Sequence, residues 1–260
     1  MPSHFSTIGF LVPSEEESLA LANRAAPLAQ AVAAEAGEYL RWTGDAGEQL
    51  WLQVGNDGNL VGMNPHFSGK SRVRVKLEAR IDRDEHSPLD GAFRAWASPP
   101  EEAPDEGMYP FVFDVPDALA YPGLSLPCVA RAQIAAFAHE IRCYESPEAY
   151  DALPEDQAPK LASQAFIPSG LFSPDGDDPV PPEARAVIAG HVIEASVCTN
   201  GLSGVAYYWA LVETYGGIYD VVIDPALLER PPCAGNVLSG QFWLSGRLVA
   251  YPGSGVPAAA

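Results

Sequence analysis

Histidine is the residue type in this chain best suited to proton transfer or metal binding, because its side chain titrates near neutral pH. His66 follows a proline in the run Asn64-Pro-His-Phe67, which would hold its ring in a defined direction. The alternative is a turn histidine whose ring bonds local backbone. His139 precedes Glu140, but Cys143 stands where the zinc-protease motif has its second histidine. Tertiary structure alone could bring together the four candidates, His4, His66, His139 and His191.

A second candidate motif is Ser68-Gly-Lys-Ser71, which is similar to the end of a phosphate-binding loop. That loop requires a glycine five residues before Gly69, where this chain has Asn64, and it requires a helix to follow. The residues that follow, 72–81, have the pattern of a strand. No serine elbow and no dinucleotide-binding glycine pattern is present either. The sequence therefore predicts no nucleotide site and no cofactor.

Charge limits the class of partner. The chain has 15 Lys and Arg against 34 Asp and Glu, a net charge of −19. Such a field repels nucleic-acid backbones and anionic membrane surfaces, so we expect neither as a partner. The start of the chain lacks a basic region followed by an apolar run, and no stretch has the roughly 20 apolar residues of a membrane span. Four widely spaced cysteines then indicate free thiols in a reducing cytoplasm.

The N-terminal part is expected to be α+β. Residues 3–12 have a strand pattern, and Ser14 with Glu17 forms a capping-box signature for a helix. Pro27 would kink this helix or divide it in two, and Gly37 is a natural C-terminal cap. Mainly antiparallel strands follow, at 38–43, 48–54, 60–67, 71–81, 91–97, 109–115 and 132–144; the last of these also fits a helix.

The C-terminal part is expected to be a small OB-like β-barrel, with an SH3-like barrel as the alternative. Its last strand places Phe242-Trp243-Leu244 between Gly240 and Gly246. Aromatic residues favour strands, and isolated glycines in strands mark bends or close backbone approach. We predict an α+β domain at 1–153, a proline-rich linker at 154–183, the barrel at 184–250 and a flexible tail at 251–260.

OB-like barrels that bind single-stranded nucleic acid combine exposed aromatics with a positive groove. Residues 184–250 contain Tyr207-Tyr208-Trp209, of which at least one must face away from the barrel core. The same stretch has three arginines, no lysine and five carboxylates. The positive groove is missing, so we do not expect nucleic acid as a partner. The outward aromatic is expected to pack on another part of the chain or on a protein.

Two resemblances carry further expectations. The segments 199–204, 216–224 and 235–247, ending in Gly-Gln-Phe-Trp-Leu-Ser-Gly-Arg, look like the ending of bacterial proteins of unknown function. This resemblance covers the last quarter of the chain and implies a barrel and a bacterial cytosolic origin. A helix followed by strands with an early histidine is similar to the vicinal-oxygen-chelate enzymes, over at most residues 4–67, and implies a metal-assisted enzyme.

We expect a binding module for a protein partner or a small ligand, without chemistry of its own, because no catalytic spacing is present. The competing hypothesis is a metal-assisted enzyme of vicinal-oxygen-chelate-like type, with His66 and His4 or His139 in its site. If the two expected domains share a cleft, a ligand would sit there. The residues predicted to line it are Trp51, His66, Arg74, Tyr208 and Arg247.

Overall fold

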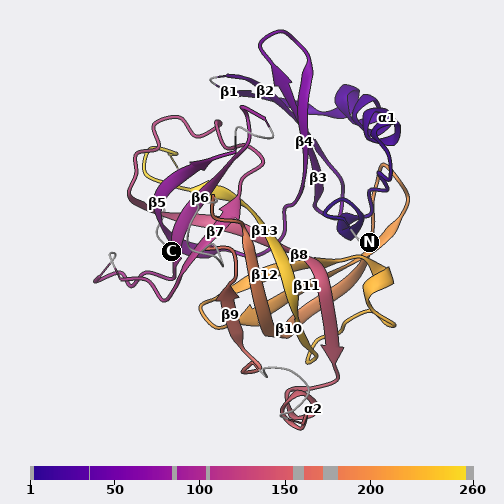
Figure 1. The fold of residues 1–260 in the computed structure, drawn as a ribbon, viewed down its shortest axis with the longest axis vertical. Coiled ribbons are helices and arrows are strands. Elements are labelled where there is room, and N and C mark those ends of the chain that lie inside the picture. Colours follow the sequence, from indigo (N-terminus) through magenta and orange to yellow (C-terminus); the bar gives the residue numbers. More distant parts are fainter. Residues whose placement is uncertain are drawn as a thin grey trace.

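A computed structural model of the protein describes residues 3–34, 36–83, 87–103, 106–154, 161–171 and 181–255. These residues form mostly strands, arranged in a four-stranded and a nine-stranded sheet (Figure 1). Among the described residues no helix is long and apolar enough to cross a membrane.

The chain begins with helical turns rather than with the strand expected at 3–12. A 3-10 turn, η1 (Ser6–Ile8), ends at Gly9, which adopts a positive φ. Helix α1 (Glu15–Ala25) follows, and a second 3-10 turn, η2 (Ala26–Leu28), contains Pro27. The division of the helix near Pro27 is confirmed. Gly37 is not a helix cap, because β1 (Gln30–Ala34) separates it from the helix and it begins β2 (Gly37–Thr43).

The start of α1 has the capping geometry that its sequence predicts. Ser14 Oγ accepts a hydrogen bond from the Glu17 backbone N–H and donates one to Glu17 Oε2 at 2.8 Å. Replacing Ser14 with alanine should lower the free energy of unfolding by about 1 kcal/mol, because an orphan N–H loses its acceptor. Urea denaturation would measure this, and an equal loss in Ser18→Ala, within the helix, would contradict a capping role.

The smaller sheet has the antiparallel order β1-β2-β3-β4, with β3 (Glu48–Gly55) and β4 (Leu60–Phe67). The hairpin predicted at 38–43 and 48–54 is confirmed. This sheet and α1 lie together at one end of the molecule (Figure 1). Leu21 and Leu50 join Phe137, Tyr207 and Val222 of the larger sheet in one buried apolar cluster, so the two sheets share a packed interface.

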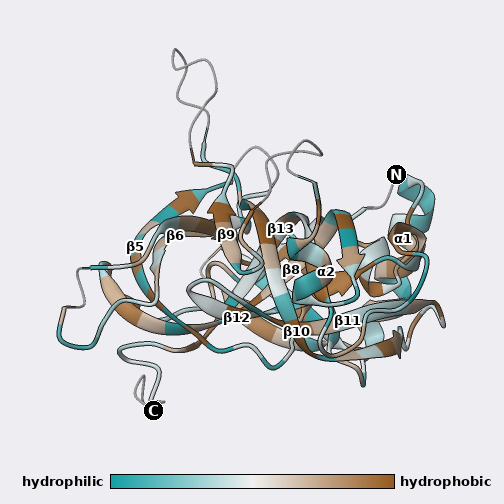
Figure 2. Ribbon diagram, turned by 90° about the horizontal axis from the view of Figure 1, so that it is seen from below, coloured by the Kyte–Doolittle hydropathy of each residue, from teal (hydrophilic) through white to brown (hydrophobic). Residues whose placement is uncertain are grey.

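The larger sheet is formed by nine strands in the order β11-β12-β8-β5-β6-β7-β13-β10-β9. They are β5 (Val73–Asp82), β6 (Gly91–Ala97), β7 (Pro110–Asp114), β8 (Cys128–Tyr144), β9 (Ala165–Pro168), β10 (Arg185–Thr199), β11 (Ala206–Thr214), β12 (Gly217–Ile223) and β13 (Val237–Ala250). A short helix α2 (Pro147–Asp151) follows β8, and a turn η3 (Pro225–Leu227) precedes β13. The segment 132–144, ambiguous in sequence, is therefore a strand. Apolar stretches lie mainly in these strands (Figure 2).

Two additional pairings, β11–β10 and β8–β13, close the larger sheet into two rings. One ring contains β5, β6 and β7 and the other contains β10, β11 and β12, and both include the long strands β8 and β13. In each ring, three consecutive strands form an antiparallel meander, and a parallel strand pairing closes the ring. In the first ring β7 pairs with β13 at Asp114 and Ser245, and in the second ring β12 pairs with β8 at residues that include Asp220 and Ala135. Ser245 and Ala135 are themselves paired across β8 and β13. The two halves thus follow the same pattern, with Asp114 and Asp220 at equivalent positions.

This topology does not confirm the expected two-domain division or the separate OB-like barrel. β13 pairs with β8 from Val237–Tyr144 to Ala250–Arg131, so strands from the segments 1–153 and 184–250 lie in one sheet. Pairing between strands about 100 residues apart leaves no local signal in the sequence. Parts of the expected linker, 155–160 and 172–180, and of the tail, 256–260, lie outside the described residues. Within the rest of the linker, β9 pairs with β10.

The glycines that bracket Phe242-Trp243-Leu244 allow close approach on both sides of β13. A Cβ at Gly240 would collide with the Glu140 carbonyl oxygen, and one at Gly246 would collide with the Phe113 ring. β13 pairs with β8 and β10 and makes one parallel pairing with β7, so it closes both rings.

Candidate functional site

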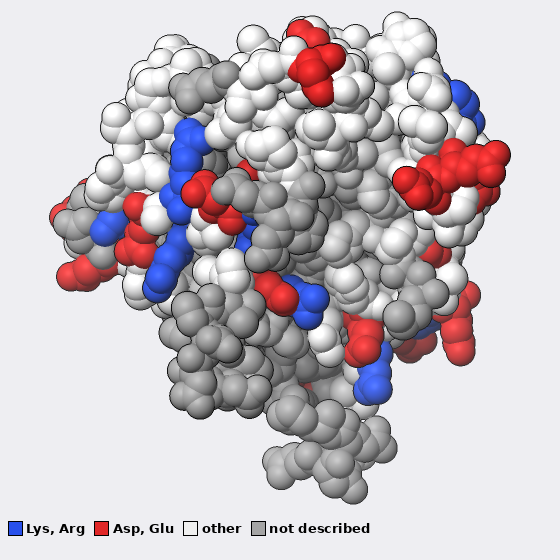
Figure 3. Space-filling model, turned by 45° about the horizontal axis from the view of Figure 1, so that its top comes forward, with Lys and Arg blue, Asp and Glu red and all other residues white. Residues whose placement is uncertain are grey.

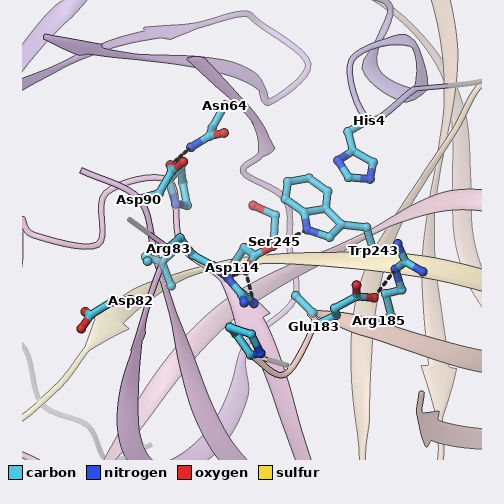
Figure 4. A pocket seen from close by; sticks show the side chains of 15 residues that line it. His4, Asn64, Asp82, Arg83, Asp90, Asp114, Glu183, Arg185, Trp243 and Ser245 are labelled. Carbon is cyan, nitrogen blue, oxygen red and sulfur yellow. Dashed lines mark hydrogen bonds and ion pairs between the residues drawn. The ribbon is translucent and has the colours of Figure 1, made fainter. Parts of the chain in front are cut away.

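The main pocket of the described structure has a volume of about 560 Å³ and lies where β5, β6, β7, β10 and β13 meet β4 at Asn64. Its polar and aromatic lining residues are His4, Asn64, Asp82, Arg83, Asp90, Asp114, Glu183, Arg185, Trp243 and Ser245. Figure 4 shows Trp243 between the Asn64–Asp90 pair on one side and the Glu183–Arg185 pair on the other. The volume is in the usual range for a small-molecule site.

Asp114, the last residue of β7, lies in this pocket with 28 % of its side chain exposed. Its Oδ2 accepts a hydrogen bond from Trp243 Nε1 at 2.6 Å, and its Oδ1 lies 3.1 Å from Arg83 Nη2. Burial raises the pKa of Asp114, and this effect exceeds the opposing effect of Arg83. The carboxyl group is thus held in a fixed orientation, in surroundings that weaken its preference for the charged form.

Asp90 is the second oriented carboxylate of the pocket. Its Oδ1 accepts hydrogen bonds from Asn64 Nδ2 at 2.6 Å and from Gln53 Nε2. Its Oδ2 accepts no hydrogen bond from the described residues. The two amide groups therefore fix the orientation of the Asp90 carboxylate through its Oδ1.

An aromatic wall is formed by Trp243 and His4, whose rings are stacked with centroids 4.1 Å apart and an interplanar angle of 4°. His4 Nε2 also lies 2.9 Å from His139 Nε2, which fits a neutral pair in which one ring donates to the other. Burial, with the charges of His139 and Arg185, lowers the pKa of His4 to about 4. His4 is therefore neutral at pH 7.

Three of the five predicted site residues come together, but inside the protein rather than along a cleft. Trp51 and His66 are fully buried, and the Arg247 guanidinium lies 4.6 Å from the Trp51 ring centroid. Arg247 is paired with buried Asp117 at 2.7 Å, and its charge contributes to lowering the pKa of His66. These contacts indicate a structural role for the cluster.

The other two predicted residues lie apart from this cluster and from the pocket lining. Arg74 on β5 donates to the Pro99 carbonyl, and Tyr208 on β11 packs against the main core. The prediction of a single lining formed by all five residues is therefore not supported by their positions.

His66 is part of a directed chain of hydrogen bonds. Gln133 Nε2 donates to Asp220 Oδ2, so Gln133 Oε1 faces His66 and accepts from its Nε2–H; both distances are 2.9 Å. His66 Nδ1 then accepts from the Ser245 hydroxyl, also at 2.9 Å. Burial lowers the pKa of His66 to about 3. The ring is a neutral core residue whose proton lies on Nε2.

The loop that is similar to a phosphate-binding loop holds a carboxylate instead of a phosphate. The backbone N–H groups of Lys70 and Ser71 each donate to Asp220 at 2.9 Å. A Cβ at Gly69 would lie 2.1 Å from Asp220 Oδ1, so glycine is required there. The fully buried Asp220 also accepts from Trp209 Nε1. An internal side chain thus already occupies the anion-binding amides of this loop.

The histidines do not converge as one set. His4 and His139 touch each other, whereas His66 bonds Ser245 and Gln133, and His191 lies on β10 opposite Val237. Within the described ranges no group of three or more His, Cys, Asp or Glu side chains is placed to hold a metal ion. The metal-assisted hypothesis therefore has no ligand set in this part of the chain.

Sequence reasoning missed Asp90 and Asp114, the two carboxylates with the best-defined orientation. A weak signal was available, because Asp114 ends the apolar run Phe111-Val-Phe113, and a polar residue at a strand end often faces a site. Asp90 has no such signal, since it precedes β6 and its amide partners come from β3 and β4.

A comparison of the chain with models of protein families found no match, and a comparison with curated protein sequences found none either. The expected resemblance to bacterial proteins of unknown function therefore stays a prediction.

Proposed function

We propose that this protein binds a small ligand in the pocket beside Trp243 and that it performs no chemistry of its own. The observation that carries this proposal is the pair of oriented carboxylates, Asp90 and Asp114, which face one concave space together with an aromatic wall. Pockets that bind small molecules combine such a volume with a few convergent polar groups. The protein partner expected from the sequence stays a prediction.

The equivalent positions of Asp114 and Asp220 indicate which hydrogen-bonding groups the ligand carries. Both aspartates accept a hydrogen bond from a tryptophan indole N–H. Asp220 also accepts from two backbone N–H groups of the loop that fills the space around it. Around Asp114 the corresponding space is the pocket. We infer that the ligand supplies N–H or O–H donors to Asp114, as the loop does to Asp220.

The charge of the pocket restricts the ligand further. Its lining has four carboxylates, Asp82, Asp90, Asp114 and Glu183, against the two guanidinium groups of Arg83 and Arg185. Both arginines pair with lining carboxylates, which leaves Asp82 and Asp90 to attract a cation. On the face seen in Figure 3, Lys and Arg side chains lie next to Asp and Glu side chains. A neutral donor-rich ligand or a small amine is thus favoured over an anion.

We also propose that one of the two rings of the larger sheet is an OB-like barrel. The ring of β10, β11, β12, β8 and β13 has five strands, a parallel pairing and a short helical turn before β13. These features support an OB-like arrangement in which β8, from the N-terminal half, supplies one strand. A cytoplasmic location and a bacterial origin stay predictions from the sequence.

The test is a binding titration followed by ¹H–¹⁵N NMR, with argininamide as the cationic probe, N-acetylglucosamine as the neutral probe and malonate as the anionic probe. We expect shifts at Trp243 with one of the first two probes and none with malonate. Asp114→Asn and Asp90→Asn should each weaken binding at least about tenfold, which corresponds to about 1.4 kcal/mol.

The matched control is Glu38→Gln, which removes an exposed carboxylate from β2 outside the pocket lining. This variant should bind as the parent does. If Glu38→Gln and Asp114→Asn weakened probe binding equally, the loss of affinity would be due to the change in overall charge. That result would contradict the proposed site. Saturable zinc binding that requires His4 or His139 would instead favour the metal-assisted hypothesis.

A further inference from the structure

Two cysteines far apart in the sequence meet at the end of the molecule where β13 begins. Cys143 lies near the end of β8, paired with Leu238 of β13, and Cys233 lies in the loop between η3 and β13. Both thiols donate to the same atom, Asn236 Oδ1, each with a sulfur–oxygen distance of 3.3 Å. The two sulfur atoms are therefore at most two hydrogen-bond lengths apart.

The loop that carries Cys233 is held in place by the backbone. Asn236 N–H donates to the Cys233 carbonyl, and Cys233 N–H donates to Asn236 Oδ1 at 3.0 Å. Gly235 adopts φ +89° in this turn, and its N–H donates to the Val192 carbonyl, while the Asn236 carbonyl accepts from Val192 N–H. The meeting of the thiols thus depends on a defined turn anchored to β10.

The two thiols differ in access to solvent. Cys233 is exposed and Cys143 is half-buried. Burial raises the pKa of Cys143, with Cys233 nearby adding to this effect and Arg230 opposing it. An oxidant in solution would reach Cys233 first, and Cys143 lies behind it as a second thiol.

We propose that Cys143 and Cys233 form a reversible disulfide and constitute a thiol oxidation site of this protein. With oxidised glutathione as the oxidant, the Cys233 thiolate attacks one glutathione sulfur and releases glutathione thiolate, which leaves a mixed disulfide on Cys233. The Cys143 thiolate then attacks the Cys233 sulfur and releases the second glutathione. Two protein thiols are oxidised, one glutathione disulfide is reduced to two glutathiones, and the two thiol protons pass to them.

Formation of the bond would link the end of β8 to the loop before β13. The sulfurs must approach to about 2.05 Å, so each gives up its hydrogen bond to Asn236. A cross-link between residues this far apart restricts the unfolded chain. We therefore expect the Tm of the oxidised protein to rise by several degrees.

The experiment is equilibration of the full chain in glutathione buffers of graded reduced-to-oxidised ratio, followed by alkylation and intact-mass analysis. We expect two of the four thiols to be lost together, and peptide mapping to link Cys143 to Cys233. Cys128→Ser and Cys198→Ser should behave as the parent. Cys143→Ser should stop at a mixed disulfide with glutathione on Cys233.

Near-ultraviolet circular dichroism establishes that each variant is folded. The parent protein, without any substitution, already tests whether Cys143 and Cys233 form the disulfide. The proposal is overturned if all four thiols of the folded parent remain alkylatable under oxidising buffer. It is equally overturned if the linked peptides contain Cys128 or Cys198, or if Cys233 accumulates only as the glutathione mixed disulfide in the parent.

Discussion

Replacing Asp220 with alanine should lower the free energy of unfolding by about 3–5 kcal/mol, because it leaves several buried N–H donors without an acceptor. The carboxylate is fully buried and accepts from Lys70 N, Ser71 N, Gln133 Nε2 and Trp209 Nε1. The hydrogen bonds from Ser71, Gln133 and Trp209 are buried and the one from Lys70 is partly buried, so the alanine variant leaves at least three donors shielded from water without their acceptor. Guanidinium denaturation, followed by tryptophan fluorescence, measures the loss.

The equivalent position provides the matched control. Asp114→Ala removes the acceptor of Trp243 and Arg83, but these groups border a pocket that water can enter. The expected loss is about 1 kcal/mol. Equal losses at Asp114 and Asp220 would show that the hydrogen bonds of the Lys70–Ser71 loop contribute little, and they would remove the physical basis for comparing the two sites.

Stability should fall as the pH is lowered from about 6.5, with His66 a main cause. Its pKa is 6.5 in the unfolded chain and about 3 in the native protein. Between these values the unfolded state binds a proton that the native state does not. The contribution of His66 to the free energy of unfolding is therefore complete above pH 6.5 and decreases as the pH falls toward 3. The slope is about 1.4 kcal/mol per pH unit for one group. His4, with a native pKa of about 4, adds to the fall above pH 4.

The variant His66→Gln isolates the contribution of this ring, because glutamine does not titrate. The free energy of unfolding should be measured by urea denaturation at several pH values from 7 to 4.5. Below pH 6.5, the unfolding free energy of the variant should depend less steeply on pH than that of the parent, by the amount that uptake of roughly one proton on unfolding produces. This difference in slope is expected whatever the stability of the variant at pH 7. Parallel curves for parent and variant would contradict a neutral buried His66.

The sequence identified most of the elements because their signals are local. The Ser14–Glu17 capping box, the break at Pro27 and the hairpin of β2 and β3 each depend on residues a few positions apart. The strand expected at 3–12 failed for a local reason as well, since an apolar run of this length fits a buried turn as well as a strand. In the structure this run contains buried Ile8 and Phe10.

The candidate site was less predictable because its parts come from distant segments. Trp51, His66 and Arg247 were selected as residue types able to bind ligands, but Trp51 and His66 are fully buried, and Arg247 lies over the Trp51 ring and pairs with the buried carboxylate of Asp117. The pocket is instead defined by Asp90 and Asp114, whose orientation depends on Gln53, Asn64 and Trp243. No local pattern encodes hydrogen bonds between residues separated by up to 129 positions.

Four properties could be predicted without a structure: the strand-rich character of the chain, its acidic charge, its capped helix and the close approach at Gly240 and Gly246. Each follows from composition or from the conformational limits of single residues. Three others could not: β8 and β13 join both halves in one sheet, Asp220 is enclosed while Asp114 faces a pocket, and Cys143 meets Cys233. These outcomes depend on the register of long-range strand pairing, which is set by the packing of the whole core.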